Sequence, residues 1–68
     1  AVDHECRTFR VVKENGERWI ETQRHGQWAR NEKINCANAK RDDAGVLVYH
    51  AWSVAADFYC PATSARRP

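Results

Sequence analysis

The pair Asn15-Gly16 constrains this chain more than any other feature, because it separates two runs rich in β-branched and aromatic residues. A type I′ turn needs a positive φ at both of its central residues, and Asn-Gly supplies that conformation at little cost. The sequence therefore predicts a β-hairpin whose strands run over about residues 6–13 and 17–23.

A two-residue turn also predicts the register of the hairpin. Because side chains alternate between the faces of a strand, Val11 and Ile20 share one face, which we expect to be the core. The pair Arg10–Glu21 then falls on the opposite face, where we expect it to be exposed and to contribute little to stability. The predicted register consists of the pairs Phe9–Thr22, Arg10–Glu21, Val11–Ile20 and Val12–Trp19.

Further strands are expected after this hairpin. Residues 27–35 indicate a third strand with poor alternation, and residues 36–45 indicate a loop that could contain a short helix. The most apolar run, residues 46–54, has the composition of a central strand, and residues 58–60 indicate a last short one.

A chain of 68 residues predicts a single domain, residues 1–68, with its core at about 5–60 and a loose tail at 61–68. Five or six short strands bury their apolar faces most economically in two packed sheets or in a small barrel. The fold class is therefore predicted to be all-β.

Three cysteines, Cys6, Cys36 and Cys60, predict one disulfide and one remaining thiol, with the pairing left open. A small core often needs such a staple, and disulfides persist in oxidising compartments, so we expect a secreted protein. The cysteines and the histidines lack the close paired spacing of zinc sites, and we expect neither a metal nor a cofactor.

The composition argues against several classes of function. A net charge of +2, from 11 basic and 9 acidic residues, is not that of a dedicated nucleic-acid binder. No apolar run is long enough to span a membrane, and we expect no membrane partner. His, Glu and Arg residues could be recruited for a ribonuclease, but no spacing indicates one, so we expect a protein that is not an enzyme. We also expect a monomer.

A docking surface is predicted on the second strand of the hairpin. We expect Arg24 and the two residues after it to lead the chain away, which makes this strand the edge of a sheet. Its candidate partner-binding residues are Arg18, Trp19, Glu21 and Arg24. An unpaired edge can accept a partner strand, although charges on an edge also serve to block aggregation.

Among the three tryptophans, we expect Trp28 and Trp52 to pack in the core. Trp19 lies opposite Val12 on the mixed face of the hairpin, and we expect it to be the exposed one. Because Trp is enriched among interface anchors, an exposed Trp19 would be the natural anchor for a partner.

Three features give the chain a resemblance to a known family. Cys6 precedes the first strand of the hairpin, Cys36 precedes the apolar later strands, and residues 53–58 read Ser-Val-Ala-Ala-Asp-Phe before the last strand. In these respects the chain resembles the MAX effectors, small secreted proteins of plant-pathogenic fungi. The resemblance implies a six-stranded antiparallel β-sandwich of two three-stranded sheets. It also implies a disulfide between Cys6 and Cys36. A bridge between Cys6 and Cys60 is the rival pairing that the sequence leaves open.

The same resemblance implies a function. Members of this family bind host proteins, including domains of immune receptors, often along an exposed sheet edge, and some are delivered into host cells. We therefore expect a secreted, non-enzymatic effector that binds a host protein. The alternatives are a small secreted ribonuclease-like toxin and an enzyme inhibitor whose binding loop would be residues 36–45.

Overall fold

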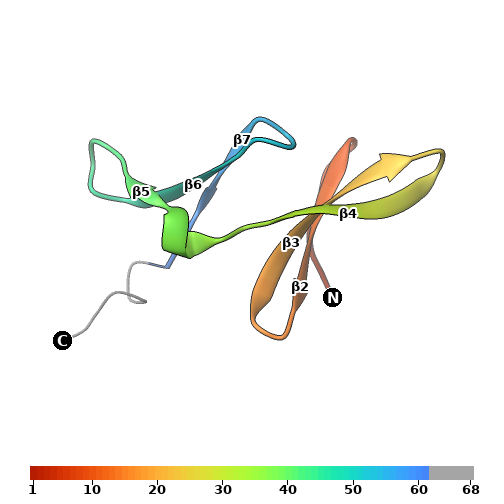
Figure 1. Ribbon diagram of the computed structural model, residues 1–68, viewed down its shortest axis with the longest axis horizontal. Helices are drawn as coiled ribbons and strands as arrows, with labels where there is room; N and C mark the ends of the chain where they lie inside the picture. The colour runs from red at the N-terminus through yellow and green to blue at the C-terminus, as the bar shows by residue number, and fades with distance from the viewer. Residues whose placement is uncertain (62–68) are drawn as a thin grey trace. The chain divides into compact units, whose positions relative to one another are not determined.

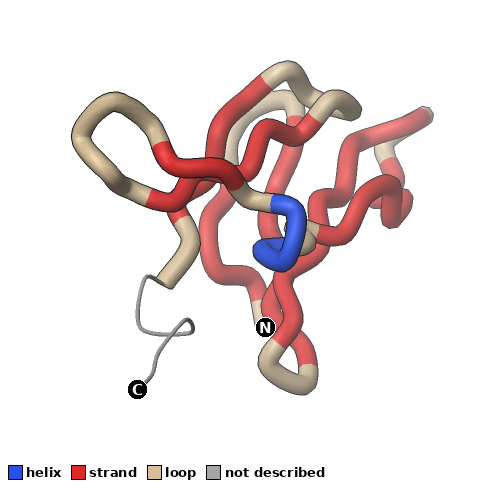
Figure 2. Tube along the Cα trace, turned by 60° about the vertical axis from the view of Figure 1, so that its left-hand side comes forward, coloured by secondary structure: helices blue, strands red, loops and turns tan. Residues whose placement is uncertain are grey.

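The computed structural model describes residues 1–61, which form seven strands in two antiparallel sheets and no α-helix (Figures 1 and 2). The chain divides into two compact units, Ala1–Ile34 and the part from Asn35 onward. The all-β prediction is confirmed. The sheets contain four and three strands, where two sheets of three were expected.

The first unit is a four-stranded meander in which each strand pairs with the next along the chain. Its strands are β1 (Val2–Glu5), β2 (Phe9–Glu14), β3 (Glu17–Arg24) and β4 (Gln27–Lys33). All four residues of β1 are exposed and three of them are polar; the sequence predicts a polar lead-in here and not a strand. It pairs with the outer edge of β2, with a register shift between Val2 and His4.

The hairpin of β2 and β3 forms as the sequence predicts. Asn15 and Gly16 both have positive φ, 54° and 78°. The register pairs Arg10 with Glu21 and Val11 with Ile20, and the other two predicted pairs are also present. This agreement follows from the tight turn, since a two-residue loop leaves no freedom in the register.

A second tight turn joins β3 to β4. His25 and Gly26 repeat the geometry of the first turn, with φ of 55° and 78°, and Arg24 pairs with Gln27 across it. The turn folds the chain back onto β3, so β3 is hydrogen-bonded to β2 on one side and to β4 on the other. The prediction that this strand is a free docking edge is therefore wrong.

A bulge in β4 explains why polar and apolar residues alternate poorly in its sequence. The register between β3 and β4 shifts between Ile20 and Glu21, which pair with Glu32 and Arg30. Asn31 is the extra residue of this bulge, and its side chain donates a hydrogen bond to Thr22. The extra residue changes which side chains share a face, so the strict period of two is lost.

The second unit begins with a short 3₁₀ helix and continues as a three-stranded sheet in the order β5–β6–β7. Its elements are η1 (Cys36–Asn38), β5 (Lys40–Arg41), β6 (Leu47–Ala51) and β7 (Ala56–Tyr59). The strand expected at 46–54 ends at Ala51, because residues 52–55 form the turn into β7 and Ala55 has a φ of 52°.

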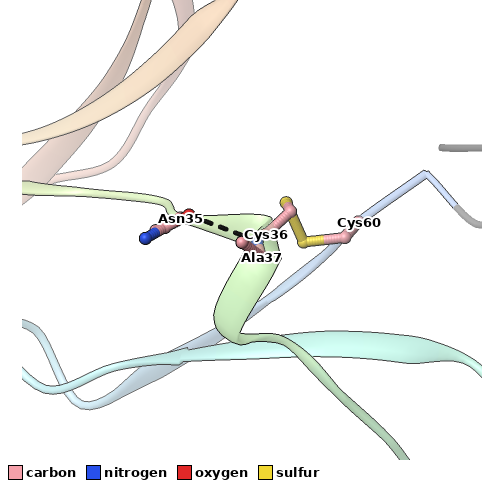
Figure 3. The surroundings of a disulfide bond; sticks show 4 residues. All are labelled: Asn35, Cys36, Ala37 and Cys60. Carbon is pink, nitrogen blue, oxygen red and sulfur yellow. Dashed lines mark hydrogen bonds between the residues drawn. A yellow bond between two sulfur atoms is a disulfide. The ribbon is translucent and has the colours of Figure 1, made fainter. Parts of the chain in front are cut away.

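The disulfide joins Cys36 to Cys60, whose Cα atoms are 5.8 Å apart (Figure 3). It ties the start of η1 to the end of β7, where the Cys60 N–H donates to the Leu47 carbonyl. Asn35 caps η1 by accepting a hydrogen bond from the Ala37 N–H at 3.2 Å (Figure 3). Cys6 keeps its thiol, in the turn between β1 and β2, so both the Cys6–Cys36 pairing and its Cys6–Cys60 rival are wrong.

The buried residues differ between the two units. In the first unit Ile20 is fully buried and Val11 is nearly so, as predicted. Val12 and Glu21 on the opposite face of the hairpin are buried as well, so burial is not confined to the predicted core face. In the second unit Ala51 and Cys60 are buried. The tail prediction falls mostly on residues 62–68, outside the described part of the chain.

Candidate functional site

A network of charges lies on the face of the first sheet opposite to Val11 and Ile20, where the sequence predicts an exposed ion pair. The register places Arg10, Glu21 and Arg30 side by side across β2, β3 and β4. Glu21 Oε1 accepts from Arg10 Nε at 2.9 Å, and Glu21 Oε2 accepts from Arg30 Nε and Nη2 at 3.1 and 3.0 Å. Glu21 is only 7% exposed, so the expectation of an exposed residue is wrong.

The environment of Glu21 has two opposing effects on its carboxyl group. Burial raises the pKa of Glu21, but hydrogen bonds from Arg10 and Arg30 and the charges of both guanidinium groups outweigh it, so the pKa lies below its ordinary value. Glu14 accepts a further hydrogen bond from Arg30 Nη1 at 2.9 Å, which lowers the pKa of Glu14 and raises that of Arg30. The carboxylate of Glu21 is therefore held ionised between two cations.

Two tryptophans extend this network. The guanidinium carbon of Arg10 lies 4.6 Å from the centre of the Trp28 ring, and that of Arg30 lies 5.3 Å from the Trp19 ring. Both distances are within the range of cation–π attraction. Trp19 is half-buried here, so the expectation that its side chain is exposed is wrong.

The four predicted partner-binding residues do not form one surface. Trp19 and Glu21 belong to the internal charge network, on the face that carries Arg10. Arg18 and Arg24 alternate to the opposite face of β3, and Arg24 lies at its far end, beside the turn to β4. The structure therefore gives this strand a role in the stability of the first sheet.

The second sheet presents a different kind of surface, which we call the aromatic face. The register pairs Val48 with Tyr59 and His50 with Asp57, and it pairs Lys40 with Val48, so these side chains share one side of the sheet. Trp52 follows at the start of the turn after β6. The aromatic face consists of Lys40, Val48, His50, Trp52, Asp57 and Tyr59.

Large aromatic side chains are exposed on this face. Trp52 is 81% exposed and Tyr59 is 72% exposed. The turn of residues 52–55 carries Trp52 beyond the end of the strand, which is why it is not covered by a neighbouring strand. The prediction that Trp52 packs in the core is therefore wrong.

His50 links the aromatic and the polar parts of the face. Its Nδ1 lies 2.7 Å from Asp57 Oδ1. Its ring lies against Trp52, with ring centres 4.5 Å apart and planes at 82°. These contacts fix the orientation of the imidazole between a carboxylate and an indole.

A hollow of about 360 Å³ opens on the second unit. The residues around it include a tryptophan, a histidine, a lysine and an asparagine. Its lining residues are Asn38, Lys40, Val48, Tyr49, His50 and Trp52.

Sequence reasoning missed this face, although one signal was present. Val48, His50 and Trp52 follow each other at intervals of two, and His50 is polar. A polar residue within an alternating series indicates the solvent side of a strand, so Trp52 belonged with the exposed residues. The apolar composition of residues 46–54 conceals this signal, because it predicts a central strand.

Other chemistry in the described residues is sparse. Within residues 1–61 no group of three or more His, Cys, Asp or Glu side chains could hold a metal ion. His4 Nε2 lies 3.1 Å from Cys6 Sγ at the turn after β1. Over the same residues, no helix is long and apolar enough to cross a membrane.

Comparison of the chain with protein-family models, with curated proteins and with solved structures found no match. The interpretation of the aromatic face therefore depends on its geometry alone.

Proposed function

We propose that the chain is a secreted, non-enzymatic effector that binds a host protein, with the aromatic face as its binding surface. The observation that carries the proposal is the exposure of Trp52 and Tyr59, at 81% and 72%. Trp and Tyr dominate the binding energy of protein interfaces, because each buries a large area with few rotatable bonds.

The polar groups around these two rings support the same function. Lys40 and the His50–Asp57 pair surround the aromatic residues with charges of both signs. An apolar centre with a polar rim is the usual anatomy of a protein interface. This surface replaces the strand β3 that the sequence suggested, and an immune-receptor domain remains within the class of partners proposed.

The secreted location is supported by the Cys36–Cys60 disulfide. A bridge that spans 24 residues contributes about 3.5 kcal/mol in the chain-entropy model. A small three-stranded sheet depends on such a contribution, and it would lose it in a reducing compartment. A monomeric state is part of the same proposal.

The test compares the wild-type protein with the double variant Trp52→Ala, Tyr59→Ala in affinity purification from host tissue extract. A partner that the wild type retains is then purified and its affinity measured directly. We expect the double variant to lose at least about tenfold in affinity, because removal of hot-spot aromatics typically costs that much.

The matched control is the double variant Val2→Ala, Val46→Ala, which removes two exposed apolar side chains outside the aromatic face. It should bind like the wild type. Thermal melts of all the variants test whether each one folds. A folded Trp52/Tyr59 variant with wild-type affinity would contradict the proposal.

A further inference from the structure

We propose that the hollow beside Trp52 binds a pyranose ring of a neutral glycan carried by the partner protein. This inference rests on the proposed function, since it names what the aromatic face recognises. It is carried by the combination of an exposed indole with a polar rim around a small hollow.

The first step of the argument concerns the aromatic platform. A pyranose ring presents a face of C–H groups that are slightly positive, and the face of an indole is negative, so the two attract each other. Trp52 is exposed enough to offer such a face. The ring planes of Trp52 and His50 lie at 82° to each other, and both residues line the hollow. A sugar ring stacked parallel to one of these aromatic rings is therefore nearly perpendicular to the other.

The second step concerns the hydroxyl groups at the edge of a sugar, which need both donors and acceptors. His50 uses Nδ1 toward Asp57, which leaves Nε2 on the other side of its ring. Asn38 and Lys40 also line the hollow. The side chain of Asn carries two donors and an acceptor, and that of Lys carries an ammonium donor.

The third step concerns charge and size. The aromatic face carries the cation Lys40 and the anion Asp57, which offset each other, so it lacks the positive field that a phosphate backbone requires. A single-stranded nucleic acid is therefore disfavoured, although it also stacks on Trp. A volume of about 360 Å³ lies at the low end of the roughly 300–1,000 Å³ of ligand pockets, which suits a single sugar ring better than a long segment.

The experiment is a titration of the ¹⁵N-labelled protein followed by NMR. The probes are chitotriose, cellotriose and mannotriose at millimolar concentration, with a uridine oligonucleotide as a comparison. The three tryptophans give three indole N–H signals, so the signals of Trp19 and Trp28 serve as internal controls. We expect at least one trisaccharide to shift the Trp52 signal and leave the other two unchanged.

Variants then test the parts of the site. Trp52→Ala should weaken binding of that trisaccharide at least about tenfold, and Trp52→Phe should restore part of it, because a phenyl ring still offers a stacking face. His50→Ala should weaken binding while the fold remains. Val46→Ala, an exposed substitution outside the face, should bind like the wild type.

The last experiment uses the partner protein itself. Enzymatic removal of its glycans should abolish binding to the wild-type chain. If no saccharide moves the Trp52 signal, if only the oligonucleotide does, or if the deglycosylated partner binds unchanged, the glycan inference is overturned. The proposed function is tested by a separate experiment, and it is contradicted if the folded Trp52/Tyr59 variant still binds the partner with wild-type affinity.

Discussion

The substitution Glu21→Gln gives the sharpest test of the charge network in the first sheet. Gln has almost the shape of Glu but no charge, and it has one acceptor oxygen where Glu21 has two. In the protein, Oε1 of Glu21 binds Arg10 and Oε2 binds Arg30. A glutamine can therefore keep one arginine and must present an NH₂ group to the other, where donor faces donor.

The expected cost follows from burial and exposure. A hydrogen bond to a charged group contributes about 1.5–3 kcal/mol, and a buried charge left without its partner costs more. The Glu21 side chain is 10% exposed, but those of Arg10 and Arg30 are 25% and 38% exposed, so water relieves part of the loss. We expect Glu21→Gln to lower the free energy of unfolding by about 2 kcal/mol.

Urea denaturation measures this loss. A domain of this size has a urea dependence of about 1 kcal/mol/M, so the midpoint should fall by about 2 M. The matched control is Glu17→Gln, the same exchange on the same strand, in the exposed pair with Lys33. It should shift the midpoint little, because water screens exposed pairs.

The two variants separate the network from a generic effect of charge. Equal small shifts for Glu21→Gln and Glu17→Gln would refute the reasoning, since they would mean that Glu21 is no better paired than a surface residue. A change in the urea dependence itself would indicate altered compactness instead of a lost interaction.

Three further predictions concern stability. Ile20→Ala should cost about 2–5 kcal/mol in a urea melt, because Ile20 is 0% exposed, and a loss under 1 kcal/mol would contradict the core assignment. The pKa of Glu21 is lowered in the folded protein, so its contribution is complete above the ordinary value of 4.5 and is lost as the pH falls through the folded value; acid titration followed by circular dichroism should show this loss, and Glu21→Gln should reduce it. Replacing Cys36 and Cys60 together by Ser should cost about 3.5 kcal/mol, and mass mapping of the non-reduced wild type should recover that pair as the cross-linked peptide.

The hairpin of β2 and β3 can be predicted from the sequence alone. Its turn depends on two adjacent residues, Asn15 and Gly16, and their preference for positive φ is local. The register and the alternation then follow by counting, which is why the pairing of Val11 with Ile20 and the burial of Ile20 were predicted correctly. The all-β class followed in the same way from the composition of the strands.

The second turn, His25-Gly26, was missed for a physical reason. Its φ values match those of Asn15-Gly16, but His adopts the left-handed conformation less readily than Asn, so the pair is a weaker signal. Without that turn the position of β4 could not be derived. The central position of β3 and the burial of Glu21 both depend on β4.

The tertiary structure alone decided how distant residues combine. Cysteine pairing depends on which strand ends meet. The hydrogen bond from Cys60 to Leu47 joins the residue after β7 to the start of β6, and no local pattern encodes this contact. The aromatic face likewise needs β5, β6 and β7 in register before Lys40, His50 and Asp57 become neighbours. The sequence alone determined the Asn15-Gly16 turn, whose energy is local. Pairing between strands selected the disulfide and the exposed surface, because their energy comes from residues far apart in the chain.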